Sequence, residues 1–215
     1  MKDIKLIIFD LDGTLVDAYP AIIKSFNYAM RKMGYPVQDD LTVRRAVGWG
    51  DENLLRPFVK PSELYKAVLI YRKHHKGSLL SNSRLLPQVN RTLSLLKKSG
   101  YKLAVASNRP TRFSWILIRH LKLDKYLDYV LCADRLRHIK PNPEILLKIM
   151  RKFKLKPAQV IYVGDMSIDI QAARRAGIKA VAVKTGSHTE QELRKENPLC
   201  IIKEISQLVE TLEDN

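Results

Sequence analysis

Two carboxylates, Asp10 and Asp12, stand one residue apart directly after a short apolar run, and they are well placed to do chemistry. The run from Leu6 to Phe9 is β-branched and aromatic, which is typical of a buried strand. Gly13 permits a sharp turn where that strand ends, and strand ends of this kind are where open α/β sheets bind their ligands. Two carboxylates held there repel each other and are costly to bury unless a cation neutralises them. The pattern therefore predicts a hard divalent metal with oxygen ligands, and Mg2+ is the ion that we expect.

A second carboxylate pair follows another apolar run. Asp165 follows the strand predicted at Val160–Val163 and the glycine Gly164, and Asp169 lies four residues later, about one turn into the next helix and facing the same way. A helix cap would explain Asp165, but it would leave Asp169 unexplained. We therefore expect both side chains near the predicted metal.

Polar groups at two further places suit a phosphate. The strand predicted at Lys102–Ala106 delivers Ser107 and Asn108, whose donors can bind phosphate oxygens. Lys140 stands in a proline-bounded loop before a helix, where a fixed ammonium could neutralise charge that moves between a phosphate and a carboxylate. Taken alone, Ser-Asn before proline is also an ordinary turn, and a loop lysine is usually a surface residue.

Taken together, these residues resemble the haloacid dehalogenase superfamily of phosphohydrolases. The motifs occur in the family's order and spacing, and the match covers nearly the whole chain. They are Asp10-Leu11-Asp12-Gly13-Thr14, then Ser107, then Lys140, and finally Gly164-Asp165 with Asp169.

The resemblance narrows to the phosphoglycolate phosphatase-like branch. Residues 10–20, 47–50 and 103–110 (DLDGTLVDAYP, VGWG and LAVASNRP) carry it. This chain has Ala18 where the branch usually has a hydroxyl residue, and Met166 where it has serine or threonine. These departures leave the chemistry intact and bear on the substrate.

The resemblance implies a mechanism and a role for each residue. Asp10 would attack phosphorus and form an aspartyl phosphate. Asp12 would protonate the leaving oxygen and later deprotonate water, and Lys140 would screen the phosphoryl charge. Ser107 and Asn108 would hold the phosphoryl oxygens. The Mg2+ ligands would be the Asp10 carboxylate, the Asp12 backbone carbonyl and Asp165, with Asp169 as a ligand or support for one.

Strand and helix patterns alternate along most of the chain, which predicts an α/β fold with a mainly parallel sheet. The family's fold is a Rossmann-like three-layer sandwich. The stretch after the first strand is helical throughout, with Asp17 as a cap of its first helix and residues 76–82 as a connection. We therefore predict a core domain of residues 1–15 and 87–215, and an all-helical cap domain of residues 16–86 inserted above the strand ends. A lid there can exclude water and select the substrate.

The composition excludes several classes of protein. The chain has 215 residues, 46% hydrophobic and 28% charged, as expected of a globular protein. It has no apolar run of membrane-spanning length, no signal-peptide pattern and no zinc-ligand spacing. Cys132 and Cys200 each lie in an apolar stretch and are predicted to be buried free thiols in a reducing cytoplasm.

The formal net charge of +16 suits an anionic substrate. The cations are spread along the chain and no RNA-binding aromatic motif accompanies them, so nucleic acid is the less favoured partner. Two alternatives stay open: a phosphosugar mutase or inorganic pyrophosphatase of the same fold, and a polyanion-binding protein with a vestigial site. The intact charged motifs argue against the second.

The sequence leaves the particular phosphate ester and the oligomeric state undetermined. Trp49 could face either a substrate or the core. The basic residues of the predicted cap could bind a substrate carboxylate, although solvated helix positions are the commoner situation for such residues. These are Arg44, Arg45, Arg56 and Lys60. The histidines show no paired ligand spacing and receive no catalytic role.

Overall fold

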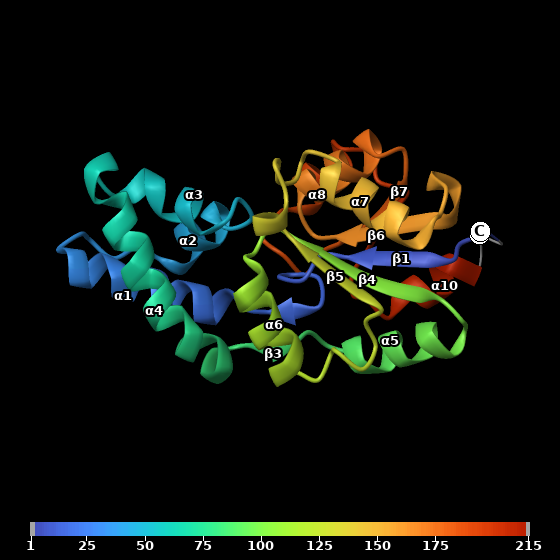
Figure 1. The fold of residues 1–215 in the computed structure, drawn as a ribbon, viewed down its shortest axis with the longest axis horizontal. Helices are drawn as coiled ribbons and strands as arrows, with labels where there is room; N and C mark the ends of the chain where they lie inside the picture. Colours follow the sequence, from blue (N-terminus) through green and yellow to red (C-terminus); the bar gives the residue numbers. More distant parts are fainter. Residues whose placement is uncertain (1–2, 214–215) are drawn as a thin grey trace.

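The computed structural model describes residues 3–213, and it has a six-stranded parallel sheet at its centre (Figure 1). The strands lie in the order β5-β4-β1-β6-β7-β8. Their bounds are β1 (Leu6–Phe9), β4 (Lys102–Ser107), β5 (Tyr129–Cys132), β6 (Val160–Gly164), β7 (Lys179–Val183) and β8 (Cys200–Ile202). The α/β fold with a mainly parallel sheet is thereby confirmed.

Helices cover both faces of the sheet because successive side chains of a strand point to opposite faces. Ile7 and Phe9 pack in one core with α5 (Val89–Lys98), α6 (Thr111–His120) and α10 (Gln207–Glu213). Leu6 and Ile8 pack in a second core with α7 (Glu144–Phe153), α8 (Ser167–Arg175) and α9 (Glu190–Arg194). This gives the three layers expected of a Rossmann-like sandwich.

The strand register brings three chain segments to one edge of the sheet. Phe9, at the end of β1, pairs with Val105 of β4 and with Val163 of β6. The residues that follow these positions therefore emerge side by side. Asp10 and Asp165 are among them, although they are far apart in the sequence.

A helical part lies beyond this edge, at the left of Figure 1. Its helices are α1 (Tyr19–Met33), α2 (Asp40–Ala46), α3 (Asp51–Leu55) and α4 (Leu64–Asn82), with 3-10 turns η1 (Arg56–Phe58) and η2 (Pro61–Glu63). Two short antiparallel strands, β2 (Val16–Asp17) and β3 (Arg84–Leu85), join it to the rest. The remaining 3-10 turns, η3 (Ala133–Arg135) and η4 (Pro157–Gln159), lie on the sheet side of the chain.

The helical part differs from the sequence prediction in two places. Residues 76–82 are no connection, because α4 continues through them with Ser78 and Leu79 buried and Gly77 on its exposed side. Asp17 caps no helix: it lies in β2 and pairs with Arg84 at 3.0 Å. A buried face of a helix thus outweighs one internal glycine.

The two cysteines are free thiols, Cys132 buried and Cys200 half-buried. Within residues 3–213, no helix has the length and apolar composition needed to cross a membrane.

Candidate active site

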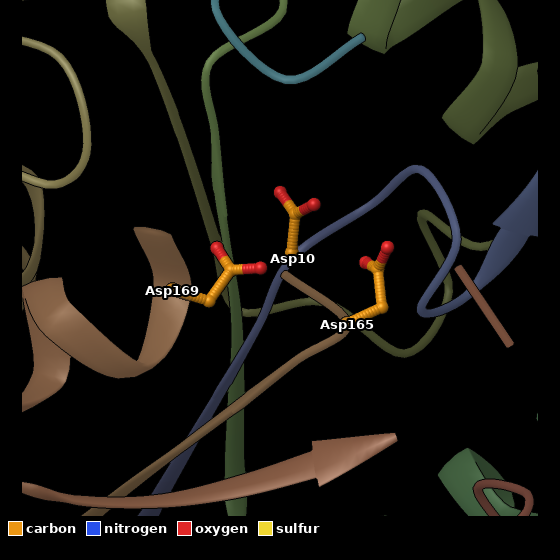
Figure 2. A group of neighbouring side chains, drawn as sticks. All are labelled: Asp10, Asp165 and Asp169. Atoms are coloured by element: carbon orange, nitrogen blue, oxygen red, sulfur yellow. The ribbon is translucent and has the colours of Figure 1, made fainter. Parts of the chain in front are cut away.

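Asp10, Asp165 and Asp169 form a buried cluster at the carboxyl edge of the sheet. One carboxylate oxygen from each lies within 4.8 Å of the others. Figure 2 shows the three carboxyl groups gathered from two neighbouring strand ends and the first turn of α8. Asp10 follows β1, Asp165 follows β6 and Asp169 lies in α8, so the parallel pairing of β1 with β6 creates the cluster.

Glycines make room for these carboxylates. A Cβ at Gly164 would lie 2.5 Å from the Asp169 side chain, and a Cβ at Gly13 or Gly186 would overlap the Asp165 carboxylate. Thr14 donates its hydroxyl hydrogen to Asp165 Oδ1 at 2.8 Å. The Asp165 carboxylate is therefore enclosed by backbone and held in one orientation.

Lys140 supplies the positive charge of the cluster. Its buried ammonium lies 2.8 Å from Asp10 Oδ1 and 2.7 Å from Asp169 Oδ1. The same Nζ donates to the Tyr162 hydroxyl at 2.8 Å, and Tyr162 in turn donates to Asp169 Oδ1 at 2.9 Å. Lys140 is thus fixed beside Asp10 by partners from β6 and α8.

Asn108 holds the loop that carries Lys140. Its Oδ1 accepts the Lys140 backbone N–H at 2.9 Å, and its Nδ2 donates to the Lys140 carbonyl at 3.1 Å. Nδ2 also donates to the Gly48 carbonyl of the helical part at 2.8 Å. The Asn108 side chain therefore connects the end of β4 to the backbones of two other segments.

Burial shapes the electrostatics of the cluster. Burial, opposed by Lys140, raises the pKa of Asp10 from 3.8 to about 7. Burial together with the neighbouring carboxylates of Asp169 and Asp10 raises the pKa of Asp165 well above its ordinary value. Burial lowers the pKa of Lys140, but the Asp10 and Asp169 carboxylates outweigh it and raise that pKa overall.

The donor set fits a divalent cation. The cluster has three buried carboxylates, and Lys140 pairs with two of them, Asp10 and Asp169. No cationic side chain of residues 3–213 forms an ion pair with Asp165. Buried charges need compensation, and carboxylate oxygens are ligands of hard cations such as Mg2+. The cluster is therefore a group of acidic side chains that could bind a metal.

Asp12 has a different environment from the three clustered carboxylates. Its two oxygens accept from Arg109 in a fork, Nε to Oδ2 and Nη2 to Oδ1, both at 2.8 Å. Arg109 directly follows Ser107 and Asn108, and its own backbone N–H donates to Ser107 Oγ at 3.2 Å. Asp12 and Arg109 form a bidentate ion pair next to the acidic cluster.

A cavity open to solvent joins these groups. All the predicted site residues except Asp165 line this cavity. Residues of the helical part line it as well. The polar side chains from the sheet side are Asp10, Asp12, Ser107, Asn108, Arg109, Lys140 and Asp169, and the helical part adds Ile22, Val47, Gly48, Gly50, Asp51, Leu54 and Tyr71.

Trp49 and the four basic residues considered for substrate binding do not line this cavity. Trp49 is 41% exposed, so it is neither core nor lining. Arg45 pairs with Glu192 at 2.9 Å, and the Arg44 guanidinium lies over the Tyr19 ring. The cationic side chains that line the cavity are Lys140 and Arg109.

Sequence reasoning assigned no role to Arg109, Tyr162 or His75. Arg109 stands directly after Ser107-Asn108 at a strand end, a position that could have indicated it. Tyr162 lies inside an apolar strand, and His75 Nε2 lies 2.7 Å from Arg109 Nη1 only because α4 packs against α6. Neither contact has a local sequence signal.

Comparison with known proteins gives the family of this chain. Residues 7–183 match the sequence profile of the haloacid dehalogenase-like hydrolases. The chain belongs to this family. It is 31% identical to the phosphoglycolate phosphatase of Vibrio parahaemolyticus over 98% of this chain and 97% of that protein. It is also 31% identical to the phosphoglycolate phosphatase of Haemophilus influenzae, over 97% and 98% respectively.

A solved structure agrees with the fold throughout. The crystal structure of a predicted phosphoglycolate phosphatase from Haemophilus somnus matches with a TM-score of 0.93 and 29% identity, covering 99% of each chain. The chain is therefore a hydrolase of the haloacid dehalogenase type in its phosphoglycolate phosphatase-like branch.

Proposed function

We propose that this protein is a Mg2+-dependent phosphatase that hydrolyses a small organic phosphate monoester through an aspartyl phosphate on Asp10. One observation carries the proposal: the Asp10 carboxylate is held 2.8 Å from the Lys140 ammonium in a cavity that Asp12 also lines. This places a nucleophile, a charge-neutralising cation and a proton-transfer group around one space. The names of the relatives, phosphoglycolate phosphatases, support the same activity.

The first step forms a bond between an Asp10 oxygen and phosphorus and breaks the bond from phosphorus to the ester oxygen. Asp12 gives a proton to that leaving oxygen, because an alkoxide is otherwise a poor leaving group. Lys140 stays beside Asp10 and reduces the repulsion between the carboxylate and the anionic phosphoryl group. Asn108 keeps Lys140 in place through its two hydrogen bonds to the Lys140 backbone.

The second step returns Asp10 to its free form. Asp12 takes a proton from a water molecule, the water oxygen attacks phosphorus, and the phosphorus–Asp10 bond breaks to release inorganic phosphate. Ser107 lines the cavity and would hold phosphoryl oxygens in both steps. Because the Asn108 amide already forms hydrogen bonds with backbone groups, we assign its main role to positioning Lys140.

The Asp10 and Asp165 carboxylates and the Asp12 backbone carbonyl would hold Mg2+, with Asp169 supporting them. A bound Mg2+ would screen the negative charge of the phosphoryl group and of Asp10. Asp169 already accepts bonds from Lys140 and Tyr162 on Oδ1 and from the Met166 N–H on Oδ2. It is therefore better suited to orienting Lys140 than to binding metal with both oxygens.

We further propose that residues 16–86 act as a cap over a core made of residues 1–15 and 87–215. The cavity between α1, α3, α4 and the sheet edge supports this division. We propose a small ester of the phosphoglycolate or sugar phosphate type, in line with the names of the relatives.

The test is release of phosphate from a panel of small phosphate esters, with Mg2+ and with a chelator, by the wild type and by Asp10→Asn. We expect release that the chelator abolishes and that the variant lacks. A folded, Mg2+-binding protein that releases no phosphate from any ester would refute the proposal, and isomerised sugar phosphate would indicate a mutase instead.

A further inference from the structure

The ion pair between Arg109 and Asp12 occupies both oxygens of the Asp12 carboxylate. The Arg109 side chain is 6% exposed and that of Asp12 13%, and both line the same cavity as Asp10. A buried fork of this kind is among the strongest side-chain pairings. In this arrangement the Asp12 oxygens face a cation rather than a leaving group.

Asp12 is the counter-charge of Arg109. Among residues 3–213 no other carboxylate pairs with Arg109, since the nearby Asp51 pairs with Arg72 at 2.9 Å. His75 contacts Arg109 from the helical part, but it brings no negative charge. The arginine can only donate, so His75 Nε2 accepts from it and the ring hydrogen lies on Nδ1, directed at Ser25 Oγ at 3.1 Å.

His75 also fixes the guanidinium in place. The ring is fully buried, stacks on Tyr71 at 4.8 Å and meets Phe113 edge-on at 5.2 Å. Burial and the charge of Arg109 lower the pKa of His75 to about 2, so the ring is neutral. Arg109 is therefore held on one side by a neutral acceptor, and on the other by Asp12.

The proposed function creates a conflict at this pair, and the inference rests on that function. Asp12 has to present an oxygen to the leaving group, and turning it toward the cavity removes the counter-charge of Arg109. A buried cation without a partner is strongly destabilising. The movement is favourable only when another anion takes the place of Asp12 on Arg109.

We propose that Arg109 is a specificity-determining residue that exchanges Asp12 for a second anionic group of the substrate, a carboxylate or a second phosphate. Binding of that group releases Asp12 for proton transfer. An ester with a neutral tail leaves Asp12 paired with Arg109 and reacts slowly. Arg109 therefore discriminates between substrates through kcat as well as through binding.

The experiment compares three esters: 2-phosphoglycolate, ethylene glycol monophosphate, which has a similar length and a neutral hydroxyl, and a short alkyl bisphosphate. For the wild type we expect kcat/KM for an anionic-tail ester to exceed that for the neutral ester by about tenfold or more. Part of this difference should lie in kcat. The carboxylate and bisphosphate arms show which anion is preferred.

In Arg109→Gln, the ratio of kcat/KM for the anionic ester to kcat/KM for the neutral ester should fall toward one. Arg109→Lys should give an intermediate ratio, because it keeps the charge but loses the two-pronged hydrogen bonding of the guanidinium. His74→Gln is the matched control, because His74 also contacts Ser25 Oγ, at 3.1 Å, but stacks on Tyr28. Its ratio should equal that of the wild type.

Equal turnover of the three esters by the wild type would overturn the inference while leaving the phosphatase intact. The inference would also be overturned if Arg109→Gln lost activity on all esters equally, so that the ratio of kcat/KM between anionic and neutral esters stayed that of the wild type. If Arg109→Gln fails to fold, Arg109→Lys decides the question in the same way. A wild type that hydrolyses none of the esters refutes the proposed function instead.

Discussion

Removal of divalent metal should make folding depend on pH through Asp10. Burial raises the pKa of Asp10 from 3.8 to about 7, so between these values the native protein keeps a proton that the unfolded chain has released. The free energy of unfolding therefore falls as pH rises through this window. The raised pKa of Asp165 acts in the same direction.

The size of the effect follows from the Asp10 values. Between about pH 5 and about pH 8, the loss of this bound proton lowers the free energy of unfolding by roughly 2–3 kcal/mol. For a chain of this length, this corresponds to a shift of the melting temperature of about 5–10 °C. A bound Mg2+ requires the ionised carboxylate, so we expect it to stabilise the protein more at the higher pH.

The assay is thermal unfolding in chelator and in Mg2+ across this pH range, for the wild type and for Asp10→Asn. The variant keeps a neutral side chain of the same shape and does not titrate. The comparison also cancels His75, whose low pKa makes its own contribution rise with pH up to about 6.5. Melting temperatures of the two proteins that remain parallel across the range in chelator would refute the electrostatic reasoning.

Three further changes test single parts of the site. Lys140→Met should lower kcat by about 10²–10³-fold without abolishing Mg2+ binding by calorimetry, and an unchanged kcat would remove Lys140 from the mechanism. Gly186→Ala should abolish Mg2+-dependent thermal stabilisation because its Cβ would overlap Asp165. Gly77→Ala is the control, because nothing lies within 4 Å of a Cβ at this exposed position of α4. It should raise the free energy of unfolding by about 0.5–1 kcal/mol. Tyr162→Phe should lower kcat several-fold with little change in KM, since it removes one partner of Lys140 and of Asp169, and a change confined to KM would contradict this role.

The parallel sheet and the acidic cluster could be predicted from the sequence because both depend on local patterns. Asp10 and Asp165 each follow an apolar run, and parallel strands place such residues at one edge. Asp169 follows Asp165 by one helical turn, so a helix brings it to the same place. These positions need no knowledge of how the helices pack.

Other features of the site could not be predicted, because they depend on tertiary packing that no local sequence pattern indicates. The contact of His75 with Arg109 arises where α4 lies against α6. The extension of α4 through Gly77 was missed because glycine usually ends a helix, whereas here a buried face on either side of it continues the helix. The amide of Asn108 was expected on a phosphate, but it bonds to backbone groups that fold back onto it.

The most direct test of the account is to identify the residue that becomes phosphorylated during turnover. Wild-type protein mixed with Mg2+ and an excess of a hydrolysed ester would be acid-quenched within one turnover, digested and analysed by mass spectrometry. The account predicts one phosphoryl group on the peptide that contains Asp10 and none in Asp10→Asn. Phosphate release without any phosphoryl group on that peptide, or release that persists in Asp10→Asn, would contradict it.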